Sequence, residues 1–235
     1  MKKKENLQNK IPVFPLSNFI IFPETTVPLN IFEPRYIKMV DDCMKGSRLI
    51  GIIQPKTNRN NPNSEIYDLG CQGHTPPKQK NNFPLDLYDI GCVGKITSFN
   101  ESDDGKYLIT LNGLNRFRII NELSNDKIYR ECEVSFDDFK NDNDIENNEI
   151  KFTDLKIIFK DLKTLFEKKG YNINWQELKK QSLDQTINTL SMASPFSLEE
   201  KQVLLESLDL ATRKIRLEEI LKTYVLDNFS NTTVQ

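Results

Sequence analysis

The spacing of apolar residues changes about halfway along the chain, and the change separates two kinds of structure. From residue 11 to 136 the signals are those of strands. Residues 107–112 alternate with a period of two, which sends successive side chains to opposite faces of a strand. The same alternation puts Arg116 and Arg118 together on one charged face. Residues 129–136 are expected to close the sheet.

The first part of this region, residues 11–45, is predicted as strand, proline-bounded loop, strand and helix. Prolines interrupt its apolar runs, which suits edge strands and turns because proline lacks a backbone donor. From Phe32 onward the apolar spacing becomes helical, with Tyr36 on the inner face. Glu33 and Pro34 are expected in the first turn, where an acid complements the helix dipole and proline loses no hydrogen bond.

Residues 150–228 show helical periodicity instead. One inner face carries a set of large apolar side chains, namely Leu155, Ile158, Phe159, Leu162, Leu165 and Phe166. Gly170 is placed to end this helix. Three polar residues are placed to cap the later helices: Asn174, Ser197 with Glu200, and Asp209. We therefore predict a small helical bundle.

Two polar stretches interrupt this pattern. Residues 137–149 form an acidic, asparagine-rich linker that is expected to be too polar to pack. Residues 57–86 form an insertion, in which EIYDLGCQG nearly repeats the later DLYDIGCVG. The second copy leads into KITSF and is the better candidate for a core strand. The first copy can pair beside it or lie on the surface. Residues 1–10 and 229–235 are expected to be tails.

Composition narrows the classes of partner. Charged residues make up 28% of the chain and the formal net charge is −2, which lacks the basic excess of a nucleic-acid-binding domain. No apolar core of a signal peptide follows the basic N-terminus, and the longest apolar run is too short to span a bilayer. We expect a cytoplasmic protein whose four cysteines are thiols.

The ordered set of segments resembles the Lon substrate-binding domain, the N-terminal domain of ATP-dependent Lon proteases. The resemblance rests on IPVFPL, VPLNIFE and the helix after it, RLIGIIQP, LYDIGCVGKITSF, KYLITLNGLNRFRI and SLEEKQVLLESLDLATRKIRLEEIL. It implies an α+β fold, in which a PUA-like, mainly antiparallel β pseudo-barrel with one helix precedes the helical bundle. The insertion departs from the short loop that the family has there.

The sequence contains few residues in arrangements that would support catalysis or metal binding. The chain contains no GxxxxGK[ST] phosphate loop, and its single histidine, His74, lies in a stretch of loop composition. Cys71 and His74 have the spacing of half a zinc site, which Cys92 can approach if the duplicated strands pair. No second half-site completes the set. We expect no enzyme activity, no cofactor and no metal.

The remaining functional signal is apolar material in a loop. Phe19, Ile20, Ile21 and Phe22 stand between two prolines, and we expect them, with Tyr36, to be partly exposed and to bind protein. Unfolded or misfolded polypeptide segments are the expected partners, and a Lon-type or other ATP-dependent protease is the expected recipient of these segments. Burial of this segment against the helical part is the competing interpretation. A PUA-like RNA-binding module is the alternative function, although nucleic acid and membranes are not the expected partners.

Overall fold

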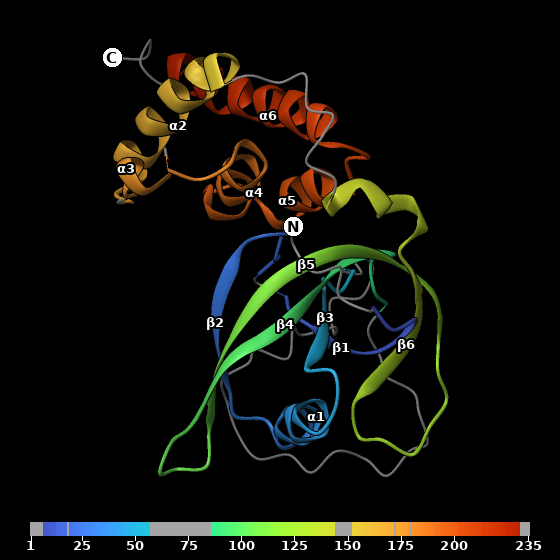
Figure 1. Ribbon diagram of the computed structural model, residues 1–235. Coiled ribbons are helices and arrows are strands. Elements are labelled where there is room, and N and C mark those ends of the chain that lie inside the picture. Colours follow the sequence, from blue (N-terminus) through green and yellow to red (C-terminus); the bar gives the residue numbers. More distant parts are fainter. Residues whose placement is uncertain are drawn as a thin grey trace.

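The protein is built from a β-sheet region followed by a helical region (Figure 1). The computed structural model describes residues 7–17, 19–56, 86–143, 152–171, 173–178 and 180–230. The strands are β1 (Lys10–Pro15), β2 (Thr26–Ile31), β3 (Leu49–Ile53), β4 (Ile90–Glu101), β5 (Tyr107–Glu122) and β6 (Arg130–Ser135). The helices are α1 (Pro34–Met44), α2 (Lys156–Lys169), α3 (Trp175–Leu178), α4 (Leu183–Ala193), α5 (Leu198–Glu206) and α6 (Leu210–Ser230), with 3₁₀ segments η1 (Asp137–Asn143) and η3 (Phe152–Leu155).

The sheet closes on itself because β5 is long enough to pair with three strands. Its first half lies between β2 and β4, and its second half pairs with β6. The sheet order is β2-β5-β4-β3-β1-β6, so the added pairing of β5 with β6 closes five strands into a barrel. Only the pairing of β1 with β3 is parallel. The predicted α+β fold with a mainly antiparallel pseudo-barrel is confirmed, and among the described strands β2 is the one with a free edge along its whole length.

Strand alternation produces two separate cores. One set of side chains fills the barrel interior around Phe117 and includes Ile11, Val13, Leu49, Ile53, Val93 and Val134. The other set faces outward from the barrel and is covered by α1 and by the helical region. All five residues of β3 are therefore buried, since both of its faces are covered. The second copy of the duplicated motif lies in β4, as predicted, and the first copy lies outside the described residues.

The helical region begins and ends its helices largely where the sequence predicts. Gly170 adopts a left-handed conformation (φ 74°) and ends α2, a role that suits a residue without a Cβ atom. Ser197 and Glu200 form a reciprocal capping box at α5. Asp209 Oδ1 accepts a hydrogen bond of 2.7 Å from the backbone N–H of Thr212 in α6. These side chains satisfy donors that the first turn of a helix cannot pair internally.

Two expectations from the sequence are wrong. The linker was expected to be too polar to pack, but its described part forms η1 and buries Phe139 against the barrel. The reason is that its carboxylates find partners on β5, as described below. In addition, β1 is an inner strand between β3 and β6 despite its prolines, and Pro12 lies where only β6 is paired. Pro28 does lie on the edge strand, β2.

A pair of glycines in the barrel gives a test of this packing. Gly94 and Gly113 are opposite each other on β4 and β5. A Cβ atom at position 113 would overlap the backbone carbonyl of Phe22, whereas one at position 94 would lie 3.4 Å from Leu111 Cβ. We expect Gly113→Ala to lower the free energy of unfolding by about 1–3 kcal/mol or more, and Gly94→Ala to cost less. Urea denaturation of both variants measures this, and equal losses would contradict the close approach.

Candidate functional site

The segment predicted to bind protein, Phe19 to Phe22, is instead part of the core. Ile20, Ile21 and Phe22 are at most 3% exposed, and Phe19 is half-buried. Tyr36 is also buried, with its ring 4.1 Å from that of Phe14. The predicted exposure is therefore wrong. Three large apolar side chains in a row are buried together, with Phe19 partly buried beside them, because the segment runs between the barrel and the helical region and both of its sides are covered.

Contacts from the helical region hold this segment in place. The guanidinium carbon of Arg213 in α6 lies 5.4 Å from the centre of the Phe22 ring. Asn188 Nδ2 in α4 donates a hydrogen bond of 2.9 Å to the carbonyl of Pro23. Gln185 of the same helix donates to the carbonyl of Glu24, a residue with a left-handed backbone (φ 61°). The segment thus joins the two regions, as the competing interpretation required.

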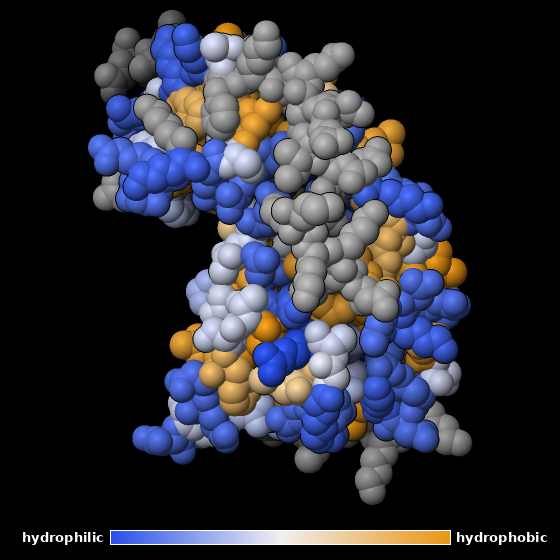
Figure 2. All heavy atoms as spheres, viewed as in Figure 1, coloured by the Kyte–Doolittle hydropathy of each residue, from blue (hydrophilic) through white to orange (hydrophobic). Residues whose placement is uncertain are grey.

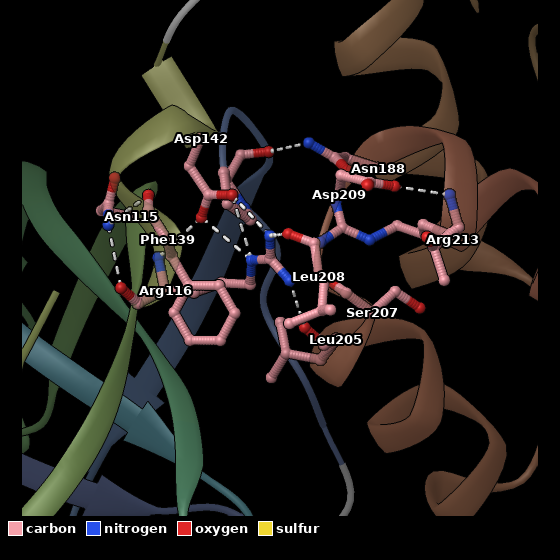
Figure 3. Close-up of polar contacts among 12 residues, drawn as sticks. Asn115, Arg116, Phe139, Asp142, Asn188, Leu205, Ser207, Leu208, Asp209 and Arg213 are labelled. Carbon is pink, nitrogen blue, oxygen red and sulfur yellow. Dashed lines mark hydrogen bonds and ion pairs between the residues drawn. The ribbon is translucent and has the colours of Figure 1, made fainter. Parts of the chain in front are cut away.

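A buried arginine lies at the centre of the junction between the two regions (Figure 3). Arg116 of β5 is 1% exposed. Its Nη2 and Nε atoms donate to the carboxylate of Asp142 in η1, with a closest distance of 2.6 Å. Its Nη1 and Nη2 atoms also donate to the carbonyls of Leu205, Ser207 and Leu208. The guanidinium therefore binds the C-terminal end of α5, where helix carbonyls lack partners and the dipole favours a cation.

A second buried arginine, Arg213, extends this network into the helical region. It is 2% exposed, and it donates to Asn188 Oδ1 and, over 2.9 Å, to the carbonyl of Leu204. Desolvation, together with repulsion from Arg116, lowers the pKa of Arg213. Its Nη2 atom has no hydrogen-bond partner among the described residues. The junction therefore holds two cations close together, and Asp142 is the carboxylate that forms an ion pair with Arg116. Asp209 lies near both arginines: its hydrogen bonds at the start of α6 lower its pKa most, and the charges of the two arginines lower it further.

Sequence alternation placed Arg116 and Arg118 on one charged face, but the two side chains have different environments. Arg118 is largely exposed and pairs with Asp138 at 2.6 Å. Arg116 alone is covered by η1 and by the turn between α5 and α6. The signal that sequence reasoning missed is the acidic run after β6, which supplies a carboxylate for each arginine.

The described cysteines are buried, and their thiols are hard to ionise. Cys43, Cys92 and Cys132 are free and buried. Burial raises the pKa of the Cys43 and Cys132 thiols to about 12 and also raises that of Cys92. Cys71 and His74, the proposed half-site for zinc, lie outside the described residues. Within the described ranges no group of three or more histidine, cysteine, aspartate or glutamate side chains is placed to hold a metal ion.

An open hollow in the helical region is a candidate for binding an apolar side chain. It lies between α3 and α4, has a volume of about 330 Å³, and is lined by Ile173, Asn174, Glu177, Leu178, Gln181, Thr189, Leu190 and Ala193. Gln181 Oε1 is buried there and has no hydrogen-bond partner within the described structure. An apolar floor with a few polar groups is typical of ligand sites. Figure 2 also shows the molecule hollowed between the helical region and the barrel, on the side of β2.

The fold is a β-barrel joined to a small helical bundle, with an open apolar hollow between α3 and α4. Residues 10–223 match the family model of the ATP-dependent protease La (LON) substrate-binding domain. The chain belongs to this family, and the resemblance seen in the sequence is confirmed. No helix in the described ranges is long and apolar enough to cross a membrane.

Relatives in sequence and in structure agree with this assignment. The Lon protease of Desulfosudis oleivorans is 23% identical over 93% of this chain and 24% of its own length. The Lon protease of Flavobacterium johnsoniae is 25% identical over 86% of this chain and 22% of its own length. The chain therefore spans about a quarter of each of these relatives.

Two solved structures share the fold. A Lon N-terminal domain protein from Xanthomonas campestris has a TM-score of 0.57 at 21% identity, over 91% of this chain and 97% of that one. The N-terminal domain of a Lon protease from the Mycobacterium avium complex has the same TM-score at 16% identity, over 93% and 98%. At these identities the likeness shows the fold alone.

The burial of the apolar segment can be tested by truncation. We expect Phe22→Ala to lower the free energy of unfolding by about 3–5 kcal/mol, because the ring is fully buried and its loss leaves a cavity. Phe19→Ala, at a half-buried position three residues earlier, is the matched control and should cost less. Denaturant titration followed by circular dichroism measures both. A Phe22→Ala protein as stable as the wild type would show that the segment is not core.

The two arginine–aspartate pairs give a second test. Asp142→Asn leaves the buried cation of Arg116 without its counter-charge, and we expect a loss of about 3 kcal/mol in the free energy of unfolding. Asp138→Asn removes the same charge from an exposed pair and should cost less than about 1 kcal/mol. The difference should survive 0.5 M salt, since buried pairs are screened weakly. Equal costs for the two variants would contradict a special role for Arg116.

Proposed function

We propose that this chain binds exposed apolar or misfolded segments of other polypeptides without changing them chemically. Membership of a family described as a substrate-binding domain, over residues 10–223, is the observation that carries the proposal. The hollow between α3 and α4 supports it, because its size and apolar floor suit one large side chain of an extended segment.

The surroundings of the basic residues favour protein over RNA as the partner. Arg116 is buried, and two of the other cations on the sheet, Arg118 and Lys106, are paired with aspartates. Single-stranded RNA sites usually combine a free basic groove with a series of stacking aromatic side chains. The cations that would form such a groove are used within the protein itself.

We further propose that the chain acts in the cytoplasm as an adaptor, which passes bound segments to a Lon-type or other ATP-dependent protease. The relatives that share its sequence are such proteases, and this chain corresponds to about a quarter of their length. In this role the protease that receives the segment supplies ATP hydrolysis and peptide cleavage.

Binding of a fluorescently labelled, permanently unfolded protein, followed by anisotropy, tests the proposal. We expect saturable binding that added salt weakens little, and no binding of the same protein when folded. Ala193→Arg, which places a long side chain at the rim of the hollow, should weaken binding. Ala211→Arg is the matched control, since it makes the same change at another exposed alanine in a helix and should have no effect.

Two results would contradict the proposal. One is failure of the wild-type chain to bind the unfolded protein at all. The other is turnover of ATP or of a casein-like substrate that persists on repurification and depends on His74, since this would indicate an enzyme.

A further inference from the structure

The hairpin of β4 and β5 extends past the barrel as an arm. The pairing of β3 with β4 ends at Lys95, but β4 continues to Glu101. Over that stretch β4 pairs only with β5, and the other side of β5 is covered by β2. The arm is therefore a three-stranded sheet made of residues 96–112 and β2, and Figure 1 shows it reaching away from the helical region.

Three of the large apolar side chains that are exposed belong to this arm or directly follow it. They are Phe32, Phe99 and Leu108, at 41%, 38% and 50% exposure. Leu108 is opposite Asn30 in the sheet, and Phe32 comes two residues after Asn30. Along this stretch Pro28, Asn30 and Phe32 are exposed, while Val27 and Ile31 are buried. Phe32 and Leu108 therefore share the outer face of the arm.

Phe99 lies on the other face of the arm, where it extends the apolar surface around the hairpin. Its ring makes an edge-to-face contact with Tyr107, with ring centres 4.8 Å apart. The hydroxyl of Tyr107, which comes directly after the turn of the hairpin, donates to Asp41 of α1 over 2.9 Å and so holds the end of the arm against α1. On the side of the barrel where β2 lies, Figure 2 shows apolar surface among polar residues.

The free edge of β2 is poorly suited to adding another strand. The carbonyl of Thr25 accepts a hydrogen bond from Gly113 on β5, so the peptide groups of Thr26, Pro28 and Asn30 face away from the sheet. Pro28 has no N–H, which removes the central donor from this edge. A partner that lies along β2 must therefore contact the arm mainly through side chains.

The end of the arm is acidic. Residues 101–106 carry three carboxylates and one ammonium, which leaves a net charge of −2. Lys106 pairs with Asp104, and its hydrogen bond to that carboxylate is the main reason that the Asp104 pKa falls to about 2. Glu101 and Asp103 are exposed and have no ion pair recorded among the described residues. They remain available to cations of a partner.

We propose that this arm is a second contact surface for client polypeptides, and that it selects segments in which large apolar side chains are next to lysine or arginine. Phe32, Leu108 and Phe99 would contact the apolar side chains, and Glu101 and Asp103 the basic ones. The inference rests on the proposed function and narrows its class of substrate. Charge complementarity supports it, since a basic client is attracted to the end of the arm whereas an acidic one is repelled.

Two labelled peptides that differ only in charge test this surface. Both carry the same leucines and phenylalanines, which are flanked by lysines in one peptide and by glutamates in the other. We expect the wild-type chain to bind the lysine peptide about fivefold more tightly, with the preference lost at high salt. Glu101→Gln combined with Asp103→Asn should abolish the preference and leave binding of the glutamate peptide unchanged or stronger.

Substitutions of the apolar residues test the other half of the surface. Leu108→Ser and Phe32→Ser should weaken binding of the lysine peptide about tenfold when combined, because they remove its apolar contacts. Ile157→Ser and Ile215→Ser, at exposed positions on α2 and α6, are the matched controls and should leave it unchanged. All these side chains are exposed, and thermal unfolding checks that each variant remains folded.

The outcomes separate this inference from the proposed function. Binding of unfolded protein and of both peptides, with no charge preference and no effect of the arm variants, would overturn the arm surface alone. Failure of the wild-type chain to bind either peptide or the unfolded protein would overturn both. A preference for the glutamate peptide would also contradict the inference.

Discussion

The arrangement of the two regions depends on the buried guanidinium of Arg116. Removing a cation from water is costly, and the cost is offset here only where three separate pieces of chain meet: β5, η1 and the turn after α5. The carboxylate of Asp142 supplies the charge and the carbonyls at the end of α5 supply the remaining acceptors. Any other placement of the helical region would take the carbonyl acceptors of Leu205, Ser207 and Leu208 away from this cation. These carbonyl contacts therefore specify how the helical region sits on the barrel, while the ion pair with Asp142 holds η1 against β5.

The residues that are buried at this junction cannot contact partners, which limits where binding surfaces can lie. The segment around Phe22, the described part of the acidic linker and Arg213 are all engaged between the two regions. Apolar groups that can be reached from solvent are found in the hollow of α3 and α4, on the β4–β5 arm and in the turn after α5, where Leu208 is exposed. The same contacts that fix the fold thus exclude the surface that the sequence had indicated.

Local features could be predicted from the sequence, whereas features set by contacts between distant residues could not. The cap at Asp209, the end of α2 at Gly170 and the alternation in β5 each depend on residues within one turn or one strand. The burial of Phe22 depends on α4 and α6, which are more than 150 residues away in the sequence. No pattern in the sequence near Phe22 predicts this burial. Arg116 and Arg118 have the same local sequence pattern, but Arg116 is buried and Arg118 is largely exposed, because only Arg116 is covered by the end of α5.

Closure of the barrel explains why client contacts are expected through side chains. An open sheet offers two free edges to an extended polypeptide, but the pairing of β5 with β6 closes the barrel. Among the described strands, β4 keeps a free edge only after Lys95, and β2 is the one strand with a free edge along its whole length. Pro28 lies in the middle of that edge and removes a donor, as edge strands often do to limit unwanted pairing. Without the proline, an unfolded chain could form backbone hydrogen bonds with the free edge of β2 and extend the sheet. Under the proposed function, side-chain contacts beside a blocked edge would let such segments bind without joining the sheet.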